Sequence, residues 1–223
     1  MEIPPTGQDL DVPVITIDGG AGTGKGAVRS IVAKALGFHQ LDSGALYRSV
    51  ALIALENKIT DISTLVEIAD NLVFEMQDEK AILSGKDVSK EIRSDEVSNR
   101  ASEISKIKEV RVALLKHELS MRKSPGLVAD GRDMSAVFET EHKFFLVASP
   151  EIRAKRRVLQ FESMGLPADY ENILKEIKNR DDVDRTREHS PMKPHAGAHI
   201  IDVNIISAKE VADIILKSYQ GMV

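Results

Sequence analysis

The sequence contains no cysteine among its 223 residues. This absence excludes disulfide bonds, thiolate metal sites and a cysteine nucleophile, and it is typical of a reducing cytosol. No apolar run approaches the roughly 18 residues of a membrane span, so we expect no membrane partner. The start, MEIPPTGQDLD, has neither the basic residues nor the apolar stretch of a secretion signal. Together these absences predict a cytoplasmic protein.

An excess of positive charge is also lacking. The chain carries 30 lysine and arginine residues against 35 aspartate and glutamate residues, a net charge of −5. We therefore expect no nucleic-acid partner, although local basic clusters could bind a small anion. With 42% hydrophobic and 29% charged residues, the composition is that of an ordinary globular protein. The length suits one domain, or one domain with a small insert.

Short apolar, β-branched runs alternate with helical patterns along the chain. Such runs suit strands that are buried on both faces, as in a parallel sheet. The predicted strands cover residues 12–18, 38–42, 127–131, 143–149 and 199–203, and the clearest helices cover 27–37 and 208–219. The alternation predicts a three-layer α/β fold with a five-stranded parallel sheet.

The stretch 61–106 breaks this alternation. Residues 72–85, LVFEMQ-DEK-AILSG, indicate an antiparallel hairpin with a short polar turn. Ser94 is a good N-cap for a helix that follows. An antiparallel hairpin within a parallel α/β chain indicates an inserted subdomain.

The segment VITIDGGAGTGKGAV, residues 14–28, carries the strongest motif. Its residues 19–25 fit the pattern G-x-x-x-x-G-K between a predicted strand and a predicted helix, which is the context of a phosphate-binding loop. Glycines let successive backbone N–H groups turn towards an anion, and the helix N-terminus adds its positive dipole end. Lys25 adds a point charge that can follow phosphate oxygens. A glycine-rich turn without a ligand is the weaker alternative.

The residue after Lys25 is Gly26, where many phosphate loops have a serine or threonine that touches Mg²⁺. Ala27 removes a further hydroxyl donor. We therefore expect Mg²⁺ to be held mainly by the nucleotide phosphates and water, and we expect no metal ligand from the protein.

Arginines follow at two further helix starts. In LDSGALYR, residues 41–48, Arg48 lies one turn inside a helix and can fork onto a phosphate. In SPEIRAKRRVLQ, residues 149–160, a serine N-cap and a proline precede arginines at i, i+3 and i+4, namely Arg153, Arg156 and Arg157. Such arginines can stabilise charge in phosphoryl transfer. Surface arginines on solvated helices are the alternative for both segments.

A predicted helix over 169–187 continues one face from apolar into charged residues. The stripe consists of Tyr170, Ile173, Ile177, Arg180, Asp184 and Arg187. Charges normally lie opposite the apolar stripe. Charges that continue along the buried direction indicate a helix that runs from the core into a wet cleft, unless it simply projects beyond the body.

Four segments in this order and spacing resemble the signature segments of bacterial cytidylate kinases: LDSGALYR, DVSKEIRSDEVSN, VADGRDM and IKNRDDVDRTRE. The resemblance covers almost the whole chain. It implies a P-loop NTPase-like fold in a single domain 1–223. Within it, the core would comprise residues 12–60, 107–150 and 190–223, the nucleoside-monophosphate-binding insert about 61–106, and a helical lid about 151–189. It also implies a monomer that transfers the γ-phosphate of ATP to CMP or dCMP.

The resemblance also implies roles for individual residues. The ATP phosphates would lie on Gly19, Gly20, Ala21, Gly22, Thr23, Gly24, Lys25, Gly26 and Ala27. The catalytic residues would be Lys25, Arg132, Arg153 and Arg157. CMP would be bound by Asp42, Ser43, Arg48, Ser102, Arg111, Arg132, Asp133, Arg180, Asp184 and Arg187.

Asp133 gives a cytosine preference a physical basis. Its carboxylate can accept a hydrogen bond from the exocyclic amine of cytosine, while Ser102 or Arg111 supplies donors to the ring acceptors. Uracil would instead present a carbonyl to this carboxylate and leave buried polar groups unpaired. A plain surface ion pair between Arg132 and Asp133 is the alternative.

The sequence departs from the family pattern at several positions. Ala21 and Ala27 stand where hydroxyl residues are usual, Ser135 replaces a usual glycine, and Val147 replaces a usual aspartate. We therefore expect an active but slower enzyme. The alternatives are an attenuated or non-catalytic nucleotide-binding protein, and a kinase for a different monophosphate or small acceptor.

Overall fold

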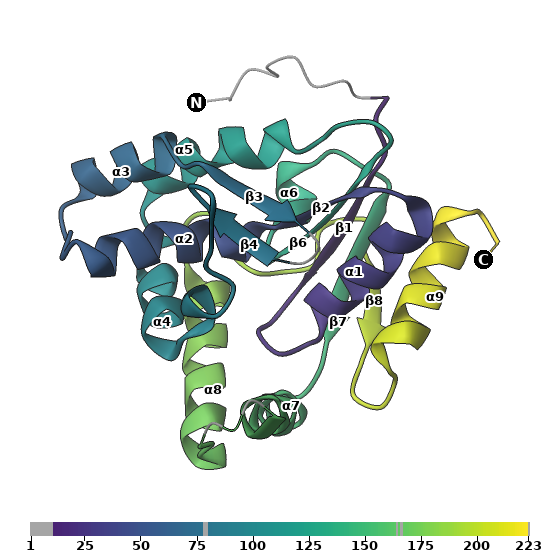
Figure 1. Cartoon of the computed structure of the whole chain (residues 1–223). Coiled ribbons are helices and arrows are strands. Elements are labelled where there is room, and N and C mark those ends of the chain that lie inside the picture. Colours follow the sequence, from purple (N-terminus) through teal and green to yellow (C-terminus); the bar gives the residue numbers. More distant parts are fainter. Residues whose placement is uncertain (1–10, 78–79, 164, 166, 223) are drawn as a thin grey trace. The chain divides into compact units, whose positions relative to one another are not determined.

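The computed structural model describes residues 11–77, 80–163, 165 and 167–222. The chain divides into two compact units. Figure 1 shows the helices and strands of the described residues. Unit 1 comprises the described residues of 1–14 and 37–129, and unit 2 those of 15–36 and 130–223. The sequence implied a different division, into core, insert and lid. That division stays a prediction.

The main sheet has five strands in the order β2-β6-β1-β7-β8. They are β1 (Val14–Gly19), β2 (His39–Asp42), β6 (Leu127–Gly131), β7 (His142–Val147) and β8 (His199–Asp202). β1 pairs with β7 and β7 with β8, both in parallel. The five predicted strands are thus confirmed within one or two residues, and so is the three-layer α/β fold with a parallel sheet.

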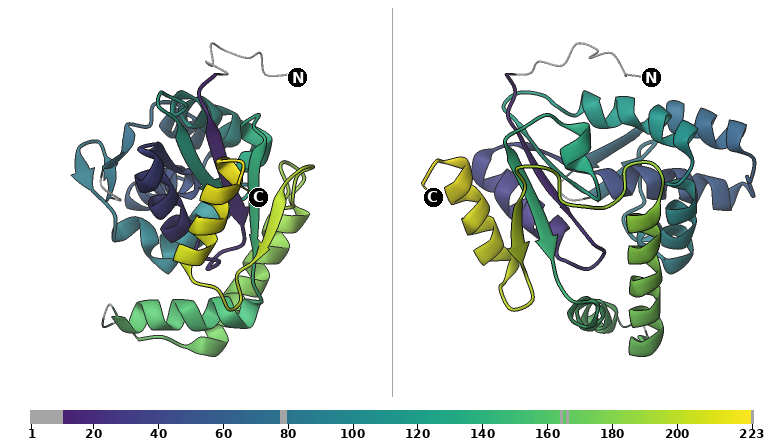
Figure 2. Two further views of the ribbon diagram at one scale, coloured as in Figure 1. Left: turned by 90° about the vertical axis from the view of Figure 1, so that its right-hand side faces the viewer. Right: turned by 180° about the vertical axis from the view of Figure 1, so that it is seen from behind.

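In unit 2, helices α1 (Lys25–Leu36) and α9 (Ala208–Tyr219) pack side by side against one face of β1, β7 and β8 (Figure 2). Ser207 begins α9 with a capping box, because its side chain accepts from the Glu210 amide while the Glu210 carboxylate accepts from the Ser207 amide. The buried faces of these elements form the core around the sheet.

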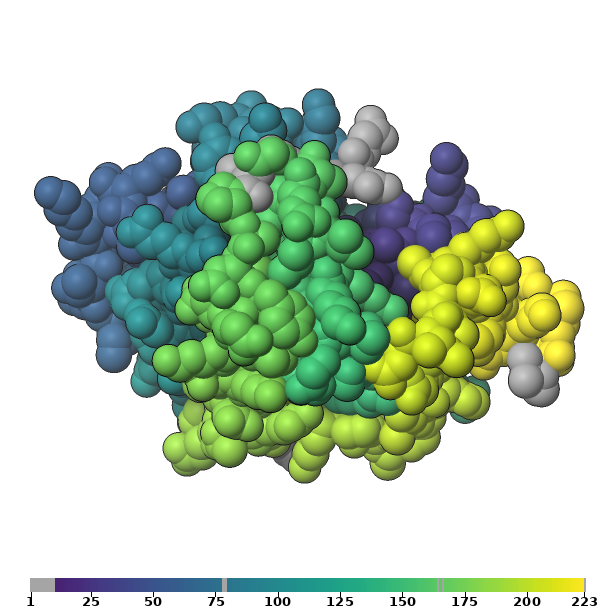
Figure 3. Space-filling view, turned by 90° about the horizontal axis from the view of Figure 1, so that it is seen from below, coloured from purple at the N-terminus to yellow at the C-terminus, as the bar shows by residue number. Residues whose placement is uncertain are grey.

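Unit 2 also contains α6 (Met134–Val137), α7 (Pro150–Ser163) and α8 (Tyr170–Thr186). α7 begins where the sequence indicated, since Ser149 Oγ accepts from the Ile152 amide at 3.3 Å. α7 and α8 pack on each other through Ala154, Ile173 and Ile177. Figure 3 shows the two helices lying against each other on one face of the molecule.

Besides β2 and the first residues of β6, unit 1 contains helices and a small antiparallel sheet. Its helices are α2 (Ser43–Glu56), α3 (Ile62–Asp70), the single-turn 3₁₀ helix η1 (Glu91–Arg93), α4 (Asp95–Ile104) and α5 (Lys108–Ser120). β3 (Phe74–Gln77), β4 (Lys80–Leu83) and β5 (Lys86–Asp87) form the small sheet. The predicted hairpin is confirmed, although the residues of its turn, 78 and 79, lie outside the described residues. The predicted N-cap is confirmed too, because Ser94 Oγ accepts from the Val97 amide at 3.3 Å.

Among the described residues, no helix combines the length and the apolar character that crossing a membrane requires.

Replacement of Ile17 by alanine tests the core of unit 2. Ile17 lies in β1 with 0% of its surface exposed, so the substitution loses apolar burial and leaves a cavity. We expect the free energy of unfolding to fall by about 2–5 kcal/mol, measured by urea denaturation. Ile205, which is 95% exposed, supplies the matched control: Ile205→Ala is expected to leave stability nearly unchanged. Equal effects of the two substitutions would contradict this view of the core.

Candidate active site

The glycine-rich segment forms a tight loop between β1 and α1, as the motif predicted. β1 ends at Gly19 and α1 begins at Lys25. Gly22 and Gly24 have φ angles of 76° and 91°, a left-handed region that residues with a β-carbon rarely adopt. The glycines therefore allow a turn that other residues would strain. Residues 19–25 are called the phosphate loop below.

Lys25 folds back onto this loop. Its Nζ donates to the carbonyl oxygens of Gly19 and Gly20, at 2.8 Å each, and only 7% of the residue is exposed. Thr23 Oγ1 donates to the Gly20 oxygen at 3.0 Å. The ammonium thus lies near the N-terminus of α1. The helix N-terminus itself also favours a bound anion.

Arg153 reaches the same loop from α7. Its Nη1 donates to the Ala21 oxygen at 3.0 Å, and its Nε donates to the Ala148 oxygen at 3.1 Å. The guanidinium also forms a two-point ion pair with Asp181 of α8, with Nη1 to Oδ1 at 2.9 Å and a short contact between Nη2 and Oδ2. The side chain is almost fully buried. That Arg153 touches the transferred phosphoryl group stays a prediction.

The other two arginines of α7 have different partners. Arg156 Nη2 donates to the Val203 oxygen at 2.5 Å. The Arg157 guanidinium lies 5.1 Å from the centre of the Phe161 ring, a cation–π contact. The helical spacing placed the three arginines on one face, but their described partners differ.

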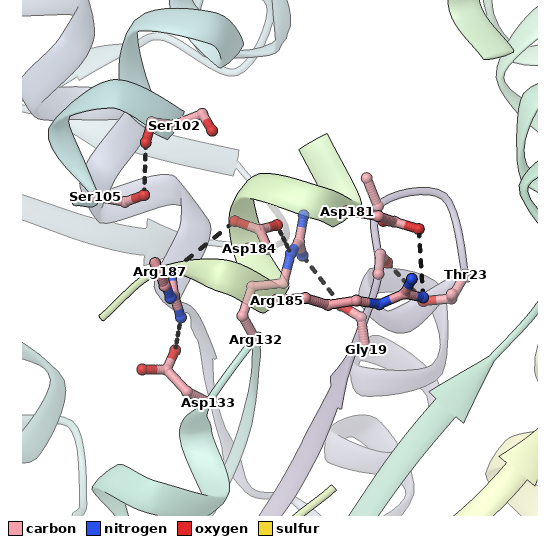
Figure 4. A network of polar contacts seen from close by, with 12 residues as sticks. Gly19, Thr23, Ser102, Ser105, Arg132, Asp133, Asp181, Asp184, Arg185 and Arg187 are labelled. Carbon is pink, nitrogen blue, oxygen red and sulfur yellow. Dashed lines mark hydrogen bonds and ion pairs between the residues drawn. The ribbon is translucent and has the colours of Figure 1, made fainter. Parts of the chain in front are cut away.

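An alternating chain of charges joins the loop after β6 to α8 (Figure 4). Arg132 Nε donates to Asp184 Oδ2 at 2.7 Å, and its Nη1 donates to the Gly19 oxygen at 3.2 Å. Arg187 Nη2 lies 3.2 Å from Asp133 Oδ1, and its Nη1 lies 4.0 Å from Asp184 Oδ1. Four of the predicted CMP-binding residues are therefore brought together in unit 2.

The ionisation of this chain follows from its contacts. Burial alone would raise the pKa of Asp184, but the positive charges of Arg132, Arg180 and Arg187 outweigh it and hold that pKa below its usual range. Burial would lower the pKa of Arg132, yet Asp184 and nearby carboxylates raise it. Both charges are thus stabilised in place. Guanidinium groups that bind carboxylates in this way can also bind a phosphate in place of a carboxylate.

In unit 1, Asp42, Ser43 and Arg48 meet at the start of α2. Asp42 caps the helix by accepting from the Ala45 amide at 3.0 Å, and its other oxygen accepts from Arg48 Nη2 at 2.9 Å. Ser43 Oγ donates to Glu118 Oε1 at 2.6 Å. The buried Glu118 carboxylate was missed by the sequence analysis, because a single glutamate within α5 gives no local signal.

Ser102 and Arg111 are linked within unit 1 through Ser105. Arg111 Nη1 donates weakly to the Ser105 oxygen at 3.4 Å, and Ser105 Oγ donates to the Ser102 oxygen at 2.8 Å. The Arg111 guanidinium also lies 5.7 Å from the centre of the Tyr47 ring on α2. These contacts fix where the two predicted cytosine-binding residues lie within the unit.

Asp18, at the end of β1, fixes the turn that carries Arg132 and Asp133. Its carboxylate accepts from the amides of Met134 and Ser135, at 2.8 and 2.9 Å, and from Ser135 Oγ at 2.7 Å. Burial raises the pKa of Asp18 despite these hydrogen bonds. Ser135, a departure from the family pattern, thus has a defined partner. An aspartate directly before the glycine loop was the signal that could have identified this contact.

No group of three or more histidine, aspartate or glutamate side chains suited to a metal ion occurs in the described part of the chain. Gly26 and Ala27 lie exposed at the start of α1 and offer no side-chain oxygen. These residues fit a cation that arrives with a nucleotide and is bound through phosphates and water.

A glycine loop between strand and helix, with a buried lysine on its carbonyls, indicates the class of protein: a nucleotide-binding P-loop protein. Its family follows from comparison with known proteins. The family model described as "Cytidylate kinase" matches residues 15–221, and the chain belongs to that family. The resemblance stated from four short segments is thereby confirmed.

Individual relatives agree with this membership over nearly their full lengths. The chain is 45% identical over 214 residues to "Cytidylate kinase" of Burkholderia vietnamiensis, covering 94% of each chain. It is 42% identical over 223 residues to "Cytidylate kinase" of Paraburkholderia phytofirmans, covering 98% of each. It is 44% identical over 212 residues to "Cytidylate kinase" of Aeromonas hydrophila, covering 92% of each.

The lowered pKa of Asp184 predicts an acid-dependent contribution to stability. A carboxylate whose pKa is lower in the folded chain stabilises it above the unfolded pKa, near 3.8, and this contribution is lost as the pH falls through the lower folded value. We expect Asp184→Asn to be less stable than the wild type at pH 7 and to lose less stability below about pH 4. Urea denaturation at several pH values measures both.

The exposed neighbour Asp182 supplies the control for this experiment. Asp182→Asn is expected to follow the pH dependence of the wild type. An Asp184→Asn chain that loses as much stability on acidification as the wild type would contradict the assignment of this effect to Asp184.

Proposed function

We propose that the chain transfers the γ-phosphate of ATP to CMP or dCMP, giving ADP and CDP or dCDP. Membership of the cytidylate kinase family over residues 15–221 is the observation that carries this proposal. The three relatives described above bear the same name over at least 92% of their lengths. No described feature favours the non-catalytic alternative.

ATP is bound on the phosphate loop and the first turn of α1, residues 19–27. Loop amides and the helix N-terminus surround the phosphates, and the Lys25 ammonium donates its third N–H to a phosphate oxygen while it holds the Gly19 and Gly20 carbonyls. An oxygen of the CMP phosphate attacks the γ-phosphorus, and the bond to the β,γ-bridging oxygen breaks, so that ADP leaves. Lys25, Arg132 and Arg157 stabilise the charge that spreads over the transferred group.

The residues that bind CMP are proposed on the strength of the family resemblance. Arg48 and Arg132 bind its phosphate, and Asp42 and Ser43 orient the start of α2 beside Arg48. Ser102, Arg111 and Asp133 bind cytosine, and the ribose region is bound by Arg180, Asp184 and Arg187. Within each unit, the hydrogen bonds and ion pairs described above hold these side chains in defined orientations.

The proposal includes Mg²⁺ bound with ATP, which neutralises phosphate charge during transfer. Because Gly26 and Ala27 offer no side-chain oxygen, the proposal has the ion bound mainly through phosphates and water. We further propose a monomer that works in the cytoplasm, with nucleotides and no nucleic acid or membrane as partners.

An acceptor panel tests the substrate class. The wild type is expected to release ADP from ATP with CMP and dCMP much faster than with UMP or AMP, in a coupled assay. Because an asparagine amide can donate as well as accept, Asp133→Asn is expected to lower the preference for CMP over UMP by about tenfold to a hundredfold. Glu139→Gln, an exposed site beyond the turn, is the control. Equal rates with all four acceptors would refute the proposed specificity.

Lys25→Met tests the phosphate loop. Loss of the ammonium is expected to lower kcat by about a hundredfold to a thousandfold, as removal of a charge-stabilising donor does in other enzymes. Lys34→Met, on the exposed side of the same helix, is expected to retain wild-type kcat. Steady-state kinetics with ATP and CMP measure both, and full activity of Lys25→Met would rule out the assigned role.

A further inference from the structure

Side chains of unit 2 hold three successive peptide groups of the phosphate loop. Lys25 donates to the Gly19 and Gly20 oxygens, Arg132 also donates to the Gly19 oxygen, and Arg153 donates to the Ala21 oxygen. In a trans peptide, the carbonyl and the following N–H point in opposite directions. Fixing these carbonyls therefore turns the following three N–H groups to the other side of the loop, the arrangement that binds an anion.

Two aspartates of α8 hold the two arginines. Asp181 pairs with Arg153. Asp184 pairs with Arg132 (Figure 4). The aspartates are three residues apart, so they lie on the same face of the helix. Asp181 is only 3% exposed. A single helix thus connects to the phosphate loop through two ion pairs, and no role for Asp181 has been assigned above.

The loop packs tightly against the Arg153–Asp181 pair. A β-carbon at Gly20 would lie 2.7 Å from Arg153 Nη1 and 3.2 Å from Asp181 Oδ1. The first distance is too short for any side chain to fit without displacing the guanidinium. The absence of a side chain at this position is therefore what lets the ion pair reach the loop backbone.

The hydrogen bonds of Arg153 suit a group that holds the loop. Burying an ion pair is costly unless its remaining donors and acceptors are satisfied. Arg153 meets this condition with both oxygens of Asp181 and the carbonyls of Ala21 and Ala148, while 2% of its surface is exposed. Movement onto a transferred phosphoryl group would break several of these contacts at once.

We propose that Asp181 and Arg153 form a positioning pair, which holds the Ala21 carbonyl and so keeps the phosphate loop in the conformation that binds ATP and ADP. Arg153 then acts through the loop backbone and makes no contact with the transferred phosphoryl group, unlike the role that the sequence implied for it. This inference rests on the proposed function and names two residues that determine donor binding in it.

The decisive measurement is the affinity for ADP, which lacks the transferred group. We expect Asp181→Asn and Arg153→Lys each to raise the dissociation constant for ADP, measured by calorimetry, by about tenfold to a hundredfold, the effect of losing a charge-assisted hydrogen bond. KM for ATP is expected to rise equally, and KM for CMP to change less than about twofold. Asp182→Asn, one residue along α8 and exposed, is expected to bind ADP as the wild type does.

A double variant tests whether the two residues act together. If the two residues act as a pair, the double variant with Asp181→Asn and Arg153→Lys binds ADP no more weakly than the single variant with the larger effect. If the increase in the dissociation constant for ADP in the double variant equals the product of the two single increases, the residues act independently and the proposal is overturned. An Arg153→Lys chain that keeps wild-type ADP affinity and loses only kcat would also overturn it, because Arg153 would then act on the transferred group.

Circular dichroism and thermal melting separate binding from folding. If Asp181→Asn does not fold, Arg153→Lys decides alone, because lysine keeps the charge and one bond to Asp181. Failure of both chains to fold would assign the pair to the stability of unit 2 and overturn the proposal. A wild type that binds ADP but phosphorylates no CMP would defeat the proposed function, while this test of the pair would still stand.

Discussion

The backbone carbonyls of residues 19–21 impose the constraint on which the rest of the site depends. When amides turn towards an anion, the carbonyls of the same peptides face the protein interior, where each needs a hydrogen-bond donor. Unit 2 supplies these donors from Lys25, Thr23, Arg132 and Arg153. An anion-binding loop therefore requires buried cations behind it, as well as amides in front.

Buried cations impose a second requirement in turn. A guanidinium removed from water loses hydration that only a well-placed carboxylate and further acceptors can replace. Asp181 and Asp184 meet this requirement, and both lie on the side of α8 that Ile173 and Ile177 anchor against α7. The apolar packing of α7 on α8 therefore fixes the position of the carboxylates, and the carboxylates fix the arginines. The apolar packing between α7 and α8 therefore influences the conformation of the phosphate loop.

The sequence predicted those parts of the fold that local patterns determine. Strand 127–131 and helix 208–219 match β6 and α9 at both ends, because apolar runs and helical periodicity are local signals. β5 was missed, since its two residues, Lys86 and Asp87, are both exposed and show no alternation. A strand that short is defined only by its pairing with β4.

The site was predictable in its motif and less so in its contacts. The phosphate loop follows from glycine spacing alone, but nothing in the spacing of Arg153, Arg156 and Arg157 distinguishes a buried partner of the loop from a half-buried cation–π contact. Asp181 did carry a local signal. It lies four and eight residues beyond Ile177 and Ile173, so helical periodicity places it on their buried face, although the family resemblance implied no role for it.

The departures at Ala21 and Ala27 can be weighed against this arrangement. At position 21 the structure uses the backbone, because Arg153 holds the Ala21 carbonyl, and a backbone carbonyl is present whatever side chain stands there. Ala27 lies exposed in the first turn of α1, where a hydroxyl would add one donor to those already given by amides and Lys25. Losing one donor among several weakens binding without removing the loop geometry on which binding depends. A site built chiefly from backbone groups thus tolerates side-chain changes that would disable a site built from side chains.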